Sequence, residues 1–89
     1  MEWRLFADVA ERADERRVSL DLETNPTVRE ALEALFDVHP ELRDRVLDGD
    51  ELAAHLTILV DGEPLGDAGL EERVDPGAEL ALFPPVSGG

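Results

Sequence analysis

Four short segments of this chain alternate apolar with polar residues, and one helical segment divides them into two pairs. The alternating segments are residues 2–8, 17–23, 56–61 and 79–83. Such alternation is typical of strands that bury one face and expose the other. With 89 residues, the chain has room for a single core. The pattern therefore predicts an α+β fold in which one main helix packs across one face of a small mixed sheet.

The helical segment lies between a break at Asn25-Pro26 and Pro40. Thr27 and Glu30 have the spacing of a capping box, with Thr27 as the N-cap and Glu30 at the N3 position. The residues that recur at helical spacing on its apolar face are Val28, Leu32, Leu35, Phe36 and His39. We therefore expect an amphipathic helix that ends at the proline.

The connections between these elements are predicted from charge and turn residues. Residues 11–16 are nearly all charge and alanine, which indicates a loop or a short helical turn that joins the first two strands into a hairpin. Leu42, Val46 and Leu47 indicate a further short helical segment. Loops or turns are also expected at residues 48–50, 61–62, 64–72 and 75–77.

The chain is strongly acidic and contains neither lysine nor cysteine. Its net charge is −14, and all eight basic residues are arginine. Such a surface repels nucleic-acid phosphate and anionic membranes, so neither is an expected partner. Without cysteine the chain can form neither a disulfide nor a thiolate metal site. The charges also repel each other across this small domain. Because the Debye length falls to roughly 3 Å at about 1 M salt, a salt-rich cytosol would screen that repulsion, and we expect halophilic behaviour.

Several further classes are excluded by the absence of their motifs. The sequence has no apolar run long enough to cross a bilayer and no signal-peptide pattern, which favours a cytoplasmic location. His39 and His55 lack nearby ligands, so we expect structural or surface roles for them. The acidic residues 48–51 lack the spacing of a calcium loop, and neither Ser19 nor Ser87 lies in a nucleophile elbow. The sequence predicts no metal, no bound cofactor and no catalytic residue.

Residues 84–89 are predicted to form a tail after a domain of residues 1–83. Pro84 and Pro85 end the last strand and direct the chain away from the body. Gly88 and Gly89 have no Cβ, so they can enter a slot too narrow for any side chain. A carboxylate is a poor electrophile until it is activated. We therefore expect a partner enzyme to act on the carboxylate of Gly89, with the preceding tail threaded into it (Pro85, Val86, Ser87 and Gly88).

Four apolar residues fall on the polar side of the alternating strands. They are Phe6, Leu59, Ala81 and Phe83, which we call the sheet patch. Scattered surface hydrophobes are common, but four on neighbouring strands beside the tail favour a docking surface for a partner. We expect Phe83→Asp to leave the fold intact and to abolish activation or partner binding.

The whole chain resembles the ubiquitin-like β-grasp family. The stretches that carry the resemblance are Leu5-Phe6-Ala7, Asp61-Gly62-Glu63, Asp75-Pro76-Gly77 and Leu82 to Gly89. Within this family the chain is similar to the small archaeal modifier proteins and to the sulfur-carrier subunit of molybdopterin synthase. The first eight residues and the acidic composition look most like the haloarchaeal modifiers.

The resemblance implies a carrier or tag that is activated by a separate enzyme. An E1-like enzyme would use ATP to adenylate Gly89, which would then be joined to lysines of target proteins, and a deconjugating metalloprotease would remove it. The same carboxylate could also become a thiocarboxylate that carries sulfur. The alternative is a dedicated sulfur carrier that docks on the large subunit of molybdopterin synthase or serves tRNA thiolation. We expect a monomer that is not itself an enzyme.

The absence of lysine restricts what such a modifier could do to its own copies. Chains of modifiers need acceptor amines on the modifier, and here Met1 supplies the one α-amine. We therefore expect single attachments, or chains joined through Met1.

Overall fold

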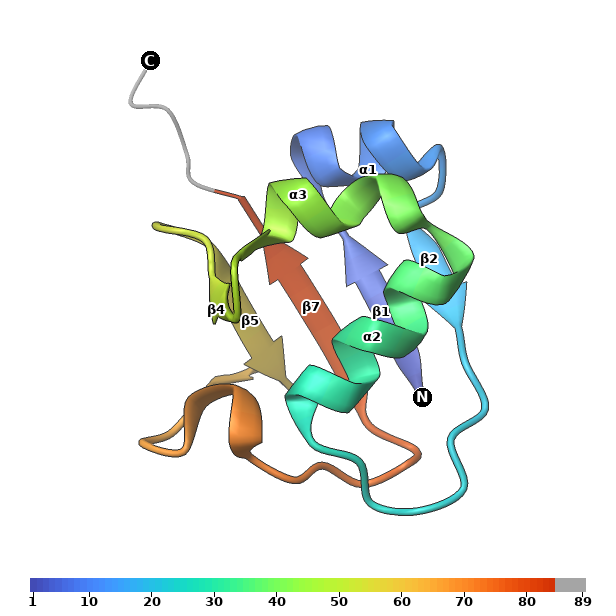
Figure 1. The fold of residues 1–89 in the computed structure, drawn as a ribbon. Coiled ribbons are helices and arrows are strands. Elements are labelled where there is room, and N and C mark those ends of the chain that lie inside the picture. Colours follow the sequence, from blue (N-terminus) through green and yellow to red (C-terminus); the bar gives the residue numbers. More distant parts are fainter. Residues whose placement is uncertain (85–89) are drawn as a thin grey trace.

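A five-stranded mixed sheet forms one layer of the protein, and helix α2 lies across one face of it (Figure 1). The computed structural model describes residues 1–84. The strands of this sheet are β1 (Glu2–Leu5), β2 (Arg17–Ser19), β5 (Thr57–Val60), β6 (Glu63–Pro64) and β7 (Glu79–Phe83). Their spatial order is β2-β1-β7-β5-β6, with β1 and β7 parallel and the other neighbours antiparallel. The first and last strands are therefore neighbours, and the α+β class predicted from the sequence is confirmed.

The remaining elements are short. They are helices α1 (Ala7–Ala13), α2 (Val28–Val38) and α3 (Arg43–Val46), 3-10 helices η1 (Pro40–Leu42) and η2 (Gly69–Glu71), and strands β3 (Leu47–Asp48) and β4 (Glu51–Leu52). Helices η1 and α3 confirm the short helical segment predicted around residues 42–47. Strands β3 and β4 pair as a separate small hairpin. The loop expected at 48–50 is thus mostly the turn of this hairpin, where Gly49 has a φ of 66°.

The core lies between α2 and the inner face of the sheet. Trp3 of β1, Leu80 and Leu82 of β7 and the apolar face of α2 are all fully or almost fully buried. The indole Nε1–H of Trp3 donates to the backbone oxygen of Ala31 in α2, with a distance of 3.1 Å between the two heavy atoms. Because this buried polar group is satisfied, a large aromatic residue can fill the centre of the core at no unpaired hydrogen-bond cost.

The start of α2 agrees with the predicted capping box. The Thr27 hydroxyl accepts a hydrogen bond from the Glu30 backbone N–H, and the Glu30 carboxylate accepts one from the Thr27 N–H. At the other end, His39 is the C-cap and Pro40 begins η1. The boundaries follow from local chemistry, because the cap satisfies free N–H groups and a proline disfavours helical geometry in the residue before it.

The prediction for residues 2–8 was wrong at its C-terminal end. Strand β1 ends at Leu5, and Ala7, expected on the buried face, is an exposed residue at the start of α1. The alternation through Ala7 agrees with a strand, but the helix buries Val9 and Ala13, which lie on one face in successive turns. Burial of these two side chains favours the helix. Strands β1 and β2 are therefore antiparallel neighbours joined by a helix, and not by the short connection of a hairpin.

The second strand is also shorter than residues 17–23. Its partner β1 begins at Glu2, so pairing cannot continue far beyond the bond between the Leu20 N–H and the Met1 oxygen. Leu20 and Leu22 still pack against the core as partly buried side chains. Strand β5 spans four of the six residues predicted at 56–61, and the chain then reverses through a two-residue turn at Asp61-Gly62. Both turn residues have positive φ values, 49° and 86°, as a type I′ hairpin turn requires.

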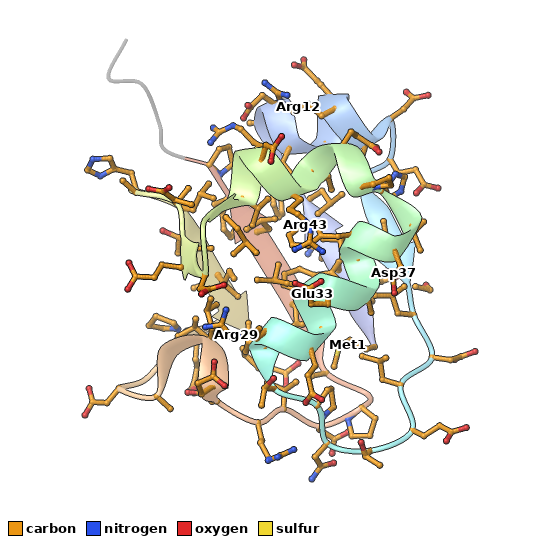
Figure 2. The ribbon with its side chains drawn as sticks, in the orientation of Figure 1. Met1, Arg12, Arg29, Glu33, Asp37 and Arg43 are labelled. Atoms are coloured by element: carbon orange, nitrogen blue, oxygen red, sulfur yellow. The ribbon has the colours of Figure 1, made fainter. Side chains whose placement is uncertain are left out.

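Ion pairs tie the short helices to α2 and to each other. Arg43 of α3 forms a forked pair with Glu33 of α2 (Figure 2), with 3.0 Å between Nη1 and Oε1. Arg45 of α3 pairs with Asp8 of α1, with 2.7 Å between Nε and Oδ2. Asp8, predicted to lie in the first strand, therefore joins α1 to α3. No helix within residues 1–84 is long and apolar enough to cross a bilayer.

Candidate functional site

The outer face of the sheet, opposite α2, carries the sheet patch predicted from the sequence. Leu59 of β5 lies directly opposite Ala81 of β7 in the strand register. Phe83 follows two residues later on the same face of β7, and Phe6 comes directly after β1. All four residues are half-buried. The parallel pairing of β1 with β7 thus brings residues from opposite ends of the chain together.

The two phenylalanines of the patch are in direct contact. Their ring centroids are 4.3 Å apart and the ring planes differ by 12°, which is a stacked arrangement. The guanidinium carbon of Arg4 lies 5.5 Å from the centroid of the Phe6 ring, within the range of a cation–π contact. The stack therefore fixes Phe83, the last residue of β7, to the end of β1.

The described part of the chain ends one residue after this stack. Pro84, which the sequence analysis assigns to the tail, is buried. The remaining tail residues to which the sequence assigns a role, Pro85, Val86, Ser87, Gly88 and Gly89, lie outside the described residues. The sheet patch therefore lies beside the last residue that the structure describes.

The two histidines occupy different environments. His39 caps α2, and its ring nitrogens lie 2.6 Å from a carboxylate oxygen of Glu15 and 3.1 Å from one of Glu41. His55 is exposed and has a φ of 67°. Among residues 1–84, no cluster of three or more metal-binding side chains has suitable geometry for a metal ion.

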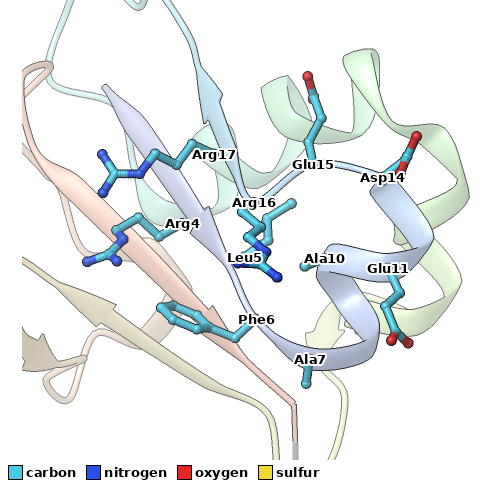
Figure 3. Close-up of a pocket in the computed structure, with 10 residues that line it drawn as sticks. All are labelled: Arg4, Leu5, Phe6, Ala7, Ala10, Glu11, Asp14, Glu15, Arg16 and Arg17. Carbon is cyan, nitrogen blue, oxygen red and sulfur yellow. The ribbon is translucent and has the colours of Figure 1, made fainter.

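A groove beside the patch was not predicted from the sequence. It has a volume of about 750 Å³ and lies between α1 and the adjoining ends of β1 and β2 (Figure 3). Phe6 belongs to both the patch and this groove. The groove is formed in part by α1, and the alternation of residues 2–8 led to a strand being predicted where this helix begins. The one sequence feature that pointed to the groove was the pair of adjacent arginines, Arg16 and Arg17.

The fold and this surface define a class of protein. A mixed sheet with parallel first and last strands and one main helix across it is a β-grasp domain of the ubiquitin-like kind. The ThiS family model matches residues 3–89, and the chain belongs to the ThiS family.

Small archaeal modifier proteins are among the relatives of this chain. The chain is 51% identical to small archaeal modifier protein 1 of Haloferax volcanii, over the full length of both chains. The crystal structure of that Haloferax protein superposes with a TM-score of 0.88 at 50% identity, covering 100% of this chain and 98% of the other. The solution structure of small archaeal modifier protein 1 of Methanosarcina acetivorans superposes with a TM-score of 0.79 at 31% identity, with coverage of 99% and 94%.

Proposed function

We propose that this chain is an archaeal ubiquitin-like protein modifier that is joined through Gly89 to lysines of target proteins. The observation that carries the proposal is the 51% identity to a small archaeal modifier protein over the entire length of both chains. The β-grasp fold supports it, as does an apolar patch at the root of the tail. In this proposal residues 1–83 are the domain that partners recognise, and residues 84–89 are the segment that is activated and transferred.

The proposed chemistry takes place on the C-terminal carboxylate and is catalysed by other proteins. An E1-like enzyme binds ATP, and the Gly89 carboxylate attacks the α-phosphorus, releasing pyrophosphate and forming an acyl adenylate. The mixed anhydride is electrophilic, so a lysine amine of the target attacks the carbonyl and AMP leaves, which creates an isopeptide bond. A deconjugating metalloprotease hydrolyses that bond. The chain itself supplies the carboxylate and its docking surface, and is not the catalyst.

The sheet patch is the proposed docking surface for the activating enzyme. Phe6 and Phe83 are stacked and held by β1 and β7, so a partner would meet a preformed surface. Aromatic anchors on rigid elements bind with little loss of conformational entropy. Because the patch lies where the chain leaves the sheet, an enzyme that covers it also receives the tail.

A second candidate function is sulfur transport, and membership of the ThiS family favours it. Here the persulfide of a donor attacks the same adenylate and displaces AMP, which forms an acyl disulfide with Gly89. A thiol then attacks the donor sulfur of that disulfide, which releases the thiocarboxylate of Gly89 and leaves the donor and the thiol joined as a disulfide. A dedicated carrier of this kind would dock on a molybdopterin synthase large subunit or serve tRNA thiolation. Both fates need the same activated carboxylate, so one molecule could serve both.

Mass spectrometry of the protein recovered from its own cells under denaturing conditions separates these fates. The intact mass reveals whether sulfur has replaced one oxygen of Gly89, and digestion reveals linkage to lysine. Since Arg73 is the last arginine and lysine is absent, trypsin leaves residues 74–89 on a modified lysine. Remnants on many proteins support the modifier, whereas a thiocarboxylate without conjugates supports the dedicated carrier. A chain that lacks Gly88 and Gly89 is the control; if it forms the same products, both functions are wrong.

A further inference from the structure

The groove beside the sheet patch gathers three of the eight arginines of this acidic chain. Arg4 lies on β1 and Arg17 at the start of β2, and Arg16 directly precedes β2. Leu5 and Ala10 line the interior between them. We call this site the arginine groove. Its volume of about 750 Å³ is in the range of binding pockets for small ligands and is large enough for several side chains.

The arginines of the groove keep much of their hydrogen-bonding capacity. A guanidinium has five N–H donors, yet Arg4 and Arg17 each make one long ion pair, 3.6 Å to Glu79 and 3.4 Å to Glu2. Within residues 1–84 the side chain of Arg16 has no acidic partner and no hydrogen bond. By contrast, Arg43 and Arg45 are each forked onto one carboxylate.

The acidic residues that line the groove do not neutralise its interior. Figure 3 shows the guanidinium of Arg16 directed towards Leu5 and Ala10, whereas the carboxylates of the three acidic lining residues, Glu11, Asp14 and Glu15, project away from it. Glu15 is held by its 2.6 Å contact with Nε2 of His39. The interior therefore combines a guanidinium with an aliphatic floor on a molecule that is otherwise strongly negative.

We propose that the arginine groove binds a segment of the activating enzyme that carries a carboxylate next to an aliphatic side chain. Arg16, whose guanidinium is directed into the groove (Figure 3), would receive the carboxylate, since guanidinium–carboxylate pairs are geometrically matched. Arg17 would add positive charge at the edge of the groove. Leu5 and Ala10 would receive the aliphatic group. This inference rests on the proposed function for the identity of the partner, and on the groove for the chemistry of the segment.

A peptide segment fits this site better than a nucleic acid does. A nucleic acid brings a phosphate charge at every nucleotide, and beyond the groove it would meet a chain with a net charge of −14. A peptide brings one or two carboxylates, and its uncharged neighbours can cross the acidic rim. The aliphatic floor also offers nothing to a phosphate, whereas an apolar side chain gains by being buried there.

Continuity with the sheet patch indicates which partner this is. Phe6 lines the groove on one side and stacks on Phe83 on the other. An enzyme that covers the stack in order to take the tail therefore reaches the groove with the same surface. The groove would add a charge-dependent contact to an otherwise apolar interface, which increases specificity more than affinity.

Steady-state adenylation kinetics and calorimetry with the E1-like enzyme of the same organism test the inference. The test variants are Arg16→Ser/Arg17→Ser and Ala10→Glu, of which the second places a carboxylate inside the groove. The matched control is Arg12→Ser/Arg73→Ser, which also removes two positive charges, but from positions outside the groove. Arg12 makes a long 3.9 Å pair and Arg73 bonds the Asn25 backbone oxygen. Thermal melts establish that each variant is folded.

We expect both groove variants to raise KM and the calorimetric Kd by roughly tenfold, the effect of one charge-assisted contact, with kcat little changed. The control should stay within about twofold of the wild type. An equal rise of KM and Kd in the control would show that the effect depends on overall charge, and would overturn the inference. Groove variants with wild-type KM and Kd would also overturn it, as would RNA binding that depends on Arg16. If the wild-type chain neither binds nor is adenylated, the proposed function fails as well; if it is adenylated and the groove variants behave as wild type, this inference alone fails.

Discussion

Phe6 and Phe83, separated by most of the chain, stack with their centroids 4.3 Å apart at the point where β1 and β7 end. Their half-buried rings form the aromatic centre of the sheet patch. The contact couples the strand that begins the fold to the strand that leads into the tail. The stack is therefore both a structural contact and the proposed docking surface, and these two roles can be separated experimentally.

Replacement of Phe83 by serine should weaken activation far more than it weakens folding. Loss of the aromatic pair costs about 0.5–1.5 kcal/mol beyond the lost burial, which a folded domain of this size can tolerate. Loss of an interface anchor costs about 2 kcal/mol or more, so KM for adenylation should rise at least roughly 30-fold. Val38→Ser is the control, because Val38 is a 53% exposed apolar residue on α2, away from the sheet patch. Equal KM values for the two variants would contradict the docking role.

Replacement of Ala7 by glycine should stabilise the protein. Ala7 begins α1 with a φ of 53°, a left-handed conformation that costs an L-residue with a Cβ about 1–2 kcal/mol. Glycine removes that cost, although it adds about 0.4–1 kcal/mol of unfolded-state entropy. We expect a net increase of about 0.5–1 kcal/mol in the free energy of unfolding, measured by urea denaturation.

A glycine elsewhere in the same helix should have the opposite effect. Ala10 lies inside α1, so Ala10→Gly should lower the free energy of unfolding by about 0.5–1 kcal/mol. If both substitutions destabilise the protein equally, the left-handed geometry at Ala7 does not control its stability.

The sequence predicts those parts of the fold that local patterns determine. The capping box at Thr27, the buried alternation of β7 and the turn at Asp61-Gly62 are local signals, and the structure confirms each of them. The first half of helix α1 was missed because alternation through Ala7 also agrees with a strand, and the burial that favours a helix depends on tertiary packing. Its last residues fall in the segment 11–16, where a loop or a short helical turn was expected.

The candidate site likewise contains one part that the sequence predicted and one part that it did not. The four patch residues were identified by alternation, since β1, β5 and β7 keep a period of two. The arginine groove could not be predicted, because its walls come from α1 and two strands whose juxtaposition is not encoded in any single segment. A site whose wall is a helix cannot be predicted when that helix is not predicted, even if its charged residues are adjacent in the sequence.

Acid should destabilise the protein partly through the pair between Glu33 and Arg43. The Arg43 guanidinium, hydrogen-bonded to the Glu33 carboxylate, holds the pKa of that carboxyl below its usual range. A carboxylate whose folded-state pKa is lowered stabilises the fold fully above its unfolded-state pKa, near 4.3. Its contribution is then lost as the pH falls through the folded-state value. We expect Glu33→Gln to lower the melting temperature at neutral pH and to reduce its fall below about pH 4.

This measurement requires high salt, because acid has a second effect of opposite sign. Protonation also lowers the net negative charge, which relieves repulsion and stabilises the fold at low ionic strength. About 1 M potassium chloride screens that repulsion and leaves the contact pair less affected. Glu23→Gln is the control, since Glu23 is exposed and belongs to no ion pair within residues 1–84. If Glu23→Gln changes the fall of the melting temperature below about pH 4 as much as Glu33→Gln does, the pair between Glu33 and Arg43 is not responsible for that fall.

Salt should raise the melting temperature, and part of this effect should arise at the β3–β4 hairpin. Asp48 and Glu51 are directly opposite each other in the strand register, and both are exposed. Like charges in this arrangement destabilise a hairpin by a few tenths of a kcal/mol, up to about 1. Asp48→Asn should therefore raise the melting temperature in dilute buffer by a few degrees. At about 1 M salt, where the Debye length is roughly 3 Å, the difference between variant and wild type should largely disappear. Glu23→Gln, which removes one charge away from this hairpin, should give a smaller gain; an equal gain would assign the salt effect to net charge alone.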